Sequence, residues 1–306
     1  MLAKLDGIDS MQALLHLLRL PVAIVAGMAG WATVYALDKT LPLYDYLLTA
    51  AVLGLMFSAA CVINDYWDVE KDRIDHPERP LPSGNLSLPQ AWWLAVGLFG
   101  LAVLAAIPLG IYPLLLVLVS IALLWNYSHI LLVNGILGNL VVAAIVSALI
   151  FLGSLVVGQP FAMLYPTGFL FCYTLAKELI WDVHDAEGDR SQGVVTVANR
   201  WGANTAFSIA WGLVVLLIIS IPIALFYLPM VHPLVFSGFA SITMLCLGIA
   251  FVQYQQQRSD HAYQRLIAWE RLSMLFGVQC GSCLRLSLKP LHRSGHRMNC
   301  LRRNRL

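Results

Sequence analysis

Long apolar runs constrain the fold of this chain more than any other feature of its sequence. A helix needs roughly 20 mostly apolar residues to cross the hydrocarbon of a bilayer. Eight runs of about that length follow one another with short connections, at 14–36, 43–63, 89–108, 111–131, 137–157, 162–181, 204–228 and 232–253. Only 12% of the 306 residues are charged and 59% are hydrophobic, which is far from the composition of a soluble domain. We therefore expect an all-α, multi-spanning integral membrane protein.

Basic residues are distributed unevenly between the connections. They occur in the N-terminal segment, in the loops after the second and sixth runs, and after the eighth: Lys4, Arg19, Lys71, Arg73, Arg79, Arg190, Arg200, Arg258, Arg265 and Arg271. The alternate connections contain only Lys39. By the positive-inside rule, the basic connections lie in the cytoplasm. We expect a multi-pass protein of the cell inner membrane, or its equivalent, with a bilayer as its surroundings and no nucleic-acid partner.

Acidic residues are concentrated in two short windows. Six lie between Asp65 and Glu78 and five between Glu178 and Asp189, out of 17 in the whole chain. Both windows follow an even-numbered run, so the same rule places both on the cytoplasmic side. Ionisable residues at the membrane edge are usually functional, and these windows are the first candidates for a site.

The two windows repeat one pattern. Both contain D-x-x-D-x-x-x-D, and a single offset of 117 relates the aspartates Asp65, Asp68 and Asp72 to Asp182, Asp185 and Asp189. This indicates two similar four-helix halves, with an acidic cluster after the second helix of each. Repeats of this kind tend to build a shared site at their interface.

Spacings of three and four place the carboxylates of each cluster on one helix face. Like charges there repel one another unless a cation binds among them. Magnesium prefers oxygen ligands, takes one or two carboxylates and leaves positions for phosphate oxygens. We therefore predict a magnesium-diphosphate site, in which the metal would stabilise a departing diphosphate. Basic residues near both windows suit the diphosphate: Lys71, Arg73, Arg79, Lys177 and Arg190. The alternative is that acidic loops only keep the connections soluble.

The motifs resemble those of the UbiA superfamily of intramembrane prenyltransferases. The resemblance rests on three segments: Asn64-Asp65-x-x-Asp68-x-x-x-Asp72 with Arg79-Pro80-Leu81-Pro82-Ser83-Gly84, Tyr127-Ser128 with Gly138-Asn139, and Asp182-x-x-Asp185-x-x-x-Asp189. It covers residues 12–277 and implies a nine-helix, all-α fold. It also implies Mg²⁺-dependent transfer of a prenyl group from a polyprenyl diphosphate to a hydrophobic acceptor.

The same resemblance implies a role for each motif residue. Asn64 and Asp68 would bind one magnesium ion, and Asp185 and Asp189 another. Asp65, Asp72 and Asp182 would be catalytic residues that support them. The diphosphate would be bound by the remaining candidates: Lys71, Arg79, Lys177, Arg190 and Tyr127. One departure is Leu132, which stands where the family often has a lysine, so one basic contact is missing.

The tract from Lys177 to Asp189, with Gly193 and Thr196 after it, resembles the branch that contains digeranylgeranylglyceryl phosphate synthase. This implies a geranylgeranyl donor and a lipid acceptor such as geranylgeranylglyceryl phosphate. An aromatic quinone precursor or a chlorophyll-type acceptor is the alternative. Two other classes stay open on the sequence alone: a cation transporter that uses the carboxylates as a relay, and an inactive membrane scaffold.

The C-terminal segment departs from the membrane pattern. A ninth apolar run begins near Leu272 and stops after Gly277, and residues 278–306 contain seven basic and no acidic residues. We expect a membrane domain over 1–277 and a basic tail over 278–306, with the ninth helix truncated. An altered reading frame would produce such a tail. A zinc site is a further alternative, with the candidate ligands Cys280, Cys283, His292, His296 and Cys300.

Overall fold

The computed structural model describes residues 6–75, 77–127, 129–130, 134–191, 193–228, 230 and 232–283. Within these ranges the side chains of residues 6–10, 71, 74, 75, 149, 191 and 274–283 are not described. The elements in the described ranges are helices, and no β-strand occurs there. This confirms the expected all-α class.

The elements fall into two consecutive groups. The first contains α1 (Asp6–Leu17), α2 (Leu20–Leu37), α3 (Leu43–Trp67), α4 (Val69–Asp75), α5 (Leu88–Ala106), the 3₁₀ turn η1 (Ile107–Leu109) and α6 (Ile111–Trp125). The second contains α8 (Gly135–Val156), α9 (Leu164–Ser191), α10 (Val197–Trp201), α11 (Ala203–Tyr227), α12 (Pro233–Gln256) and α13 (Asp260–Cys283). Each of the eight predicted apolar runs overlaps a helix, although the run 14–36 is divided between α1 and α2 and the run 111–131 extends beyond α6.

Local signals in the sequence set several helix ends. The Ser87 side chain accepts from the amide of Gln90, whose own side chain accepts from the amide of Ser87, so a capping box begins α5. Asn134 begins α8 in the same manner, by accepting from the amides of Ile136 and Leu137. Gly110 has a φ of 112° where η1 meets α6, a conformation that glycine adopts at little cost.

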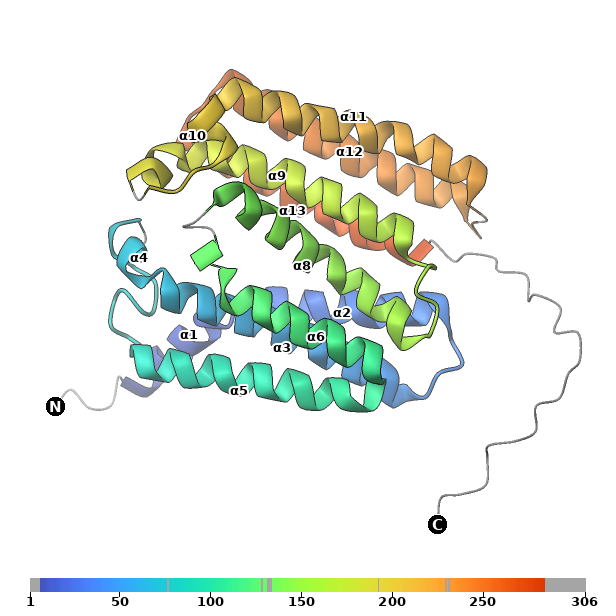
Figure 1. Cartoon of the computed structure of the whole chain (residues 1–306), viewed down its shortest axis with the longest axis horizontal. Helices are drawn as coiled ribbons and strands as arrows, with labels where there is room; N and C mark the ends of the chain where they lie inside the picture. Colours follow the sequence, from blue (N-terminus) through green and yellow to red (C-terminus); the bar gives the residue numbers. More distant parts are fainter. Residues whose placement is uncertain are drawn as a thin grey trace, which may run out of the picture.

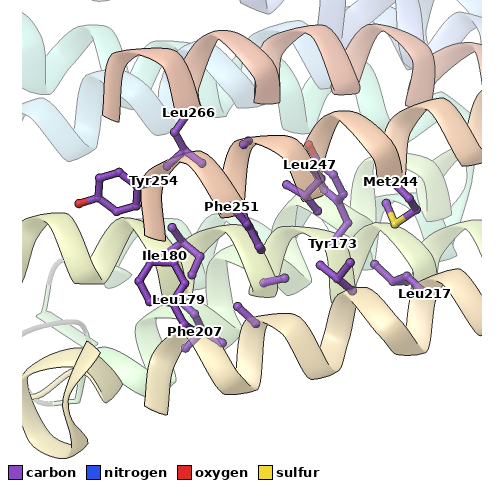
Figure 2. Close-up of a cluster of buried hydrophobic side chains, with 14 of the residues drawn as sticks. Tyr173, Leu179, Ile180, Phe207, Leu217, Met244, Leu247, Phe251, Tyr254 and Leu266 are labelled. Carbon is purple, nitrogen blue, oxygen red and sulfur yellow. The ribbon is translucent and has the colours of Figure 1, made fainter. Parts of the chain in front are cut away.

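Two separate hydrophobic cores support the prediction of two halves. One core joins α1, α3, α5 and α6, with a single contribution from α8 through Leu152. The other joins α9, α10, α11, α12 and α13, and Figure 2 shows its central side chains, among them Tyr173, Phe207 and Leu247. Figure 1 shows the corresponding two layers, with α8 between them. Because α8 packs on α9, α2 and α6, it connects the halves.

Both connections that follow the acidic clusters lie at one end of the molecule. The short helices α4 and α10 belong to these connections, and Figure 1 places them together at the end where α3 and α9 finish. The sequence could predict this only by assuming a membrane; here the chain path itself brings the two windows to the same end.

The described helices do not by themselves confirm the count of eight membrane spans plus a ninth. Five described helices are long and apolar enough to cross a bilayer, namely α2, α3, α5 with η1, α11 and α12. A sixth is α8, if its two parts, bent by 42°, form one span. The apolar helix α6 is shorter. These helices show an integral membrane protein, while the full count stays a prediction.

The last helix also differs from expectation. α13 continues past Gly277 to Cys283, so the described helix is not broken at Gly277. A run of apolar residues was a poor guide here, because backbone hydrogen bonds extend a helix wherever no proline or strong breaker intervenes. Residues 284–306 lie outside the described residues, and with them His292, His296 and Cys300. The division into 1–277 and 278–306 therefore stays a prediction.

Close packing of α2 on α3 yields a first testable consequence. A Cβ added at Gly27 would lie 2.9 Å from the carbonyl oxygen of Ala50, which is closer than real Cβ contacts. We expect Gly27→Ala to lower the free energy of unfolding by about 1–3 kcal/mol, because the helices must separate. The matched control is Gly97→Ala on α5, where nothing lies within 4 Å; its stability should not fall. Unfolding in mixed micelles measures both, and equal stability of the two variants would contradict the packing.

Candidate functional site

The first acidic cluster lies where α3 ends and α4 begins. Asp68 is the C-cap of α3, and its amide donates to the carbonyl oxygen of Asn64. The side chains of the same two residues also meet, since Asn64 Nδ2 donates to Asp68 Oδ2 at 2.9 Å. The two oxygen-bearing side chains predicted to bind one metal ion are therefore neighbours on one face.

The other two aspartates of this cluster are buried and paired with arginines. Asp65 and Asp72 are each 4% exposed. Asp72 accepts two hydrogen bonds from Arg79 Nη1, at 2.8 Å and 2.7 Å. Asp65 Oδ1 lies 3.1 Å from Arg19 Nη2 and 3.9 Å from Arg79 Nη1. These two carboxylates are thus held by cations inside the protein, which suits a supporting role.

A turn over residues 79–84 holds Arg79 in place. The amide of Ser83 donates to the carbonyl oxygen of Arg79, and the amide of Leu86 donates to that of Pro80. Gly84 has a φ of 80°, and Leu81 is buried in the first core. Because these bonds close the turn, Arg79 reaches back toward α3 and α4 from a fixed position.

The second cluster lies on the last turns of α9. Glu178, Asp182, Asp185 and Asp189 are spaced by four, three and four, so they share one face of this helix. Asp182 is 8% exposed and accepts a hydrogen bond of 2.7 Å from Asn139 Nδ2 on α8. Asp189 is buried and Asp185 is exposed.

The halves hold their first aspartate in related ways. Asp65 is bound by Arg19, directly before α2, and Asp182 is bound by Asn139, in the first turns of α8. In each half the partner therefore comes from the start of the helix that opens that half. The repeat extends beyond the aspartates to the side chains that position them.

The predicted diphosphate-binding cations differ in their surroundings. Lys177 is buried, with Nζ at 3.0 Å from Glu178 Oε1 and at 3.6 Å from the centre of the Trp181 ring. Arg190 is exposed in the last turn of α9. Lys71 has no described side chain. The structure therefore brings Arg79 and Lys177 to the two clusters and leaves Arg190 at the surface beside Asp189.

Tyr127 lies within the electrostatic influence of both acidic clusters. It follows the end of α6, and burial raises the pKa of its hydroxyl. The charges of Glu178, Asp68, Asp182 and Asp189 raise this pKa further, in that order. Carboxylates of both halves therefore contribute to the electrostatic surroundings of this phenol. Ser128 and Leu132 lie outside the described residues.

A cavity of about 250 Å³ opens beside this phenol. It lies between α3, α6 and α8, and polar groups gather at one end of it: Arg19, Asn64 and Tyr127. The rest of its lining is almost wholly apolar, as Met56, Val117 and Val146 illustrate. Such a cavity has room for an apolar chain whose polar end lies at the acidic clusters.

The donor chemistry of the clusters fits magnesium. Carboxylate oxygens, which α3 and α9 both carry, and amide oxygens such as that of Asn64 are its preferred protein ligands, and one or two per ion suffice when phosphate oxygens complete the shell. In the described part of the chain, no three His, Cys, Asp or Glu side chains are grouped closely enough to hold a metal ion by themselves.

The structure adds residues to the site that the sequence did not single out. Arg19 was assigned only to topology, yet it lines the cavity and pairs with Asp65. It is the one described non-glycine residue with a positive φ, 47°, and such strain is often stored at functional sites. Glu270 on α13 is 3% exposed and accepts from Trp181 Nε1. The sequence offered no distinct signal for Glu270, because α13 also carries Asp260, Arg265 and Arg271.

Sequence comparison identifies the family. Residues 23–275 match the model of the UbiA prenyltransferase family. The chain is 32% identical over 220 residues to digeranylgeranylglyceryl phosphate synthase from Sulfolobus acidocaldarius, which covers 71% of this chain and 79% of that protein. It is 35% identical over 217 residues to the Saccharolobus solfataricus protein of the same name, covering 70% and 73%.

Solved structures share the fold. A UbiA homologue from Archaeoglobus fulgidus bound to GPP and Mg²⁺ has a TM-score of 0.68 and 18% identity, over 89% of this chain and 99% of that one. A structure from work on digeranylgeranylglyceryl phosphate synthase in membranes also has a TM-score of 0.68, with 22% identity, over 90% and 98%. With the sequence match, these set aside the transporter alternative: the chain belongs to the UbiA prenyltransferase family and is a prenyltransferase.

Proposed function

We propose that the protein transfers a geranylgeranyl group from geranylgeranyl diphosphate to a lipid alcohol such as geranylgeranylglyceryl phosphate, with Mg²⁺ as the cofactor. The observation that supports this most is the cavity, in which an apolar lining leads to Asn64 and Tyr127 beside both acidic clusters. The synthases that the chain resembles carry this activity in their name.

We assign the metal ligands by pairs. Asn64 with Asp68, and Asp185 with Asp189, would hold the ions between the halves. Bound Mg²⁺ would neutralise charge on the departing diphosphate. Asp65 binds Arg19, Asp72 binds Arg79, and Asp182 binds Asn139. These bonds hold α3, α4 and α9 in position. Their role is to keep the ligand pairs at the correct separation.

The chain's own cations and phenol orient the diphosphate. Arg79 and Lys177 each pair with an acidic residue of one cluster, and Tyr127 follows α6 nearby. Lys71 and Arg190 would bind the diphosphate from the edge of the site. Lys177 has three N–H donors, so its bond to Glu178 leaves donors for phosphate oxygens. The active site faces the cytoplasm, as the distribution of basic loops indicates.

A membrane assay tests this function. Membranes containing the protein are incubated with radiolabelled geranylgeranyl diphosphate, geranylgeranylglyceryl phosphate and Mg²⁺. We expect a labelled ether lipid whose formation stops with EDTA and resumes with added Mg²⁺. A product formed with homogentisate but with no lipid acceptor would favour the aromatic alternative. Absence of any Mg²⁺-dependent product with either acceptor would refute the proposal.

The cavity leads to a prediction on donor length. Ser120 on α6 lines the cavity, whereas its neighbour Val119 is 57% exposed toward the surroundings of the bundle. We expect Ser120→Phe to raise KM for geranylgeranyl diphosphate by at least about tenfold, the loss of roughly one to two buried methylene contacts. Dimethylallyl diphosphate should be affected much less. Val119→Phe is the control, and equal effects on both donors would show that the chain lies elsewhere.

A further inference from the structure

Arg19 joins α1 to α2 at the end of the molecule where the acidic clusters lie. Figure 1 shows α1 at the same end as α4 and α10. The backbone turns at Arg19 through a left-handed conformation, with φ 47° and ψ 43°, and its amide donates to the carbonyl oxygen of His16. This conformation is unfavourable for a residue with a side chain, and such strain often persists at binding sites. The local backbone therefore marks Arg19 as a candidate functional residue.

Arg19 also lies at the border between the cavity and the outer surface of the bundle. Its side chain lines the cavity together with Asn64 and Tyr127. The two residues that flank it, Leu18 and Leu20, line a second, almost wholly apolar groove of about 870 Å³ between α2, α3 and α5. Several side chains of this groove are exposed on the outside of the bundle, where lipid would surround them: Leu20, Ile24 and Met28. A lipid whose polar end lies at Arg19 would therefore meet apolar surface on either side of it.

We propose that Arg19 binds the phosphate group of the lipid acceptor and so selects a phosphorylated acceptor. The inference rests on the proposed function and deepens it, because no residue has yet been assigned to the acceptor. A phosphate monoester carries about 1.5–2 negative charges near neutral pH, so it approaches the two acidic clusters only if a cation receives it. A guanidinium suits this group, because its planar pairs of N–H donors match phosphate oxygens.

The guanidinium of Arg19 has donors left for such a ligand. It presents five N–H groups, and its ion pair with Asp65 runs from Nη2 at 3.1 Å. The side chain of Arg19 is 43% exposed, whereas that of Asp65 is 5% exposed. Arg79 Nη1 lies 3.9 Å from the same oxygen of Asp65. Asp65 therefore keeps a second cation nearby when Arg19 contacts an anion.

Arg19 differs in position from the cations that are assigned to the diphosphate of the donor. Among the described residues that line the cavity, it is the one basic residue. Arg79 comes from the turn after α4, and Lys177 comes from α9 in the other half. The acceptor's hydroxyl has to reach the allylic carbon of the donor, and its phosphate lies only a few bonds from that hydroxyl. Arg19 is therefore the described cation that is placed to bind the phosphate.

The test compares two acceptors with full-length protein. One is geranylgeranylglyceryl phosphate, and the other is geranylgeranylglycerol, the same lipid without its phosphate. The second lipid is used as an acceptor or, where it is not prenylated, as a competitive inhibitor. We expect the unmodified protein to prefer the phosphorylated lipid and Arg19→Gln to lose about 10–100-fold of this preference, the usual effect of hydrogen bonds to a charged group. Reduced folding of the variant would affect both lipids alike, so the preference reports the phosphate contact.

Two further measurements separate this contact from donor binding and from folding. In Arg19→Gln, KM for geranylgeranyl diphosphate should stay within about threefold, because the donor contacts are unchanged. Arg19→Lys keeps a positive charge beside Asp65 but lacks the planar pairs of donors. It should be as stable as the unmodified protein and show an intermediate preference. Arg265→Gln is the matched control, an exposed arginine that donates to Gln257, and its preference should not change.

The proposal is overturned if Arg19→Gln keeps the preference of the unmodified protein, or if KM rises for the donor as much as for the acceptor. It is equally overturned if the unmodified protein binds both lipids equally well, or if Arg19→Lys or Arg265→Gln loses as much preference as Arg19→Gln. Failure of the proposed function looks different, because then the unmodified protein itself shows no Mg²⁺-dependent transfer to either lipid.

Discussion

Replacing either proposed metal ligand, by Asp68→Asn or Asp185→Asn, is expected to lower kcat/KM for prenyl transfer by about 10²–10³-fold or more. Charge that develops on the diphosphate is stabilised by preorganised groups of this kind, and losing one has an effect of that size. Since the two residues belong to equivalent positions of the halves, both variants should be impaired to a similar degree. Transfer is measured as labelled lipid formed over a range of Mg²⁺ concentrations.

The repeat supplies matched controls for these variants. Glu70 and Glu187 are related by the same offset of 117, are exposed, and lie two residues after Asp68 and Asp185. Glu70→Gln and Glu187→Gln remove the same charge from the same elements and should leave kcat/KM within about threefold. A loss of activity in the controls as large as in the aspartate variants would mean that net charge alone matters. Full activity of Asp68→Asn would refute the assigned ligands.

Arg79→Ala is expected to cause the largest loss of stability. It removes the arginine that binds buried Asp72, and one of the two described cations near Asp65. Breaking a buried pair by deleting one partner costs about 3–5 kcal/mol. We expect the lower part of that range, since the Arg79 side chain is 26% exposed. Unfolding in mixed micelles, followed by circular dichroism, measures the change.

Arg73→Ala is the control for this prediction. Arg73 pairs with Glu70 at 2.8 Å, and the two side chains are 55% and 75% exposed. An exposed pair contributes about 0–1 kcal/mol, so this variant should be nearly as stable as the original protein. Equal losses of stability in Arg79→Ala and Arg73→Ala would show that the burial of the Arg79–Asp72 pair is not the cause of the destabilisation.

Much of the site could be predicted because its signals are local. Two identical spacings at a constant offset give Asp68 and Asp185 equivalent positions in the repeat, near the ends of α3 and α9. The turn after Arg79 was equally predictable, since proline and glycine restrict the backbone by themselves. The residues that support the aspartates were not predictable. Arg19 and Asn139 are 46 and 43 positions away from their partners, and no local pattern encodes such a distance.

Some helix ends can likewise be predicted from the local sequence, and others cannot. α5 begins at Ser87 because its own sequence builds a capping box. By contrast, α13 continues past Gly277, where the apolar pattern stops. Glycine alone weakens a helix by only about 1 kcal/mol, so the end of an apolar run was not the end of the helix.

The sequence by itself determined the class of this protein, the apolar helices, the repeated carboxylates and the family. These follow from composition and from short-range periodicity, which act within a few residues. Only the tertiary structure decided that Arg19, Asn64 and Tyr127 line one apolar cavity, and that Trp181 on α9 donates to Glu270 on α13. Those relations depend on how helices pack, and packing is settled by side-chain shape across the whole bundle.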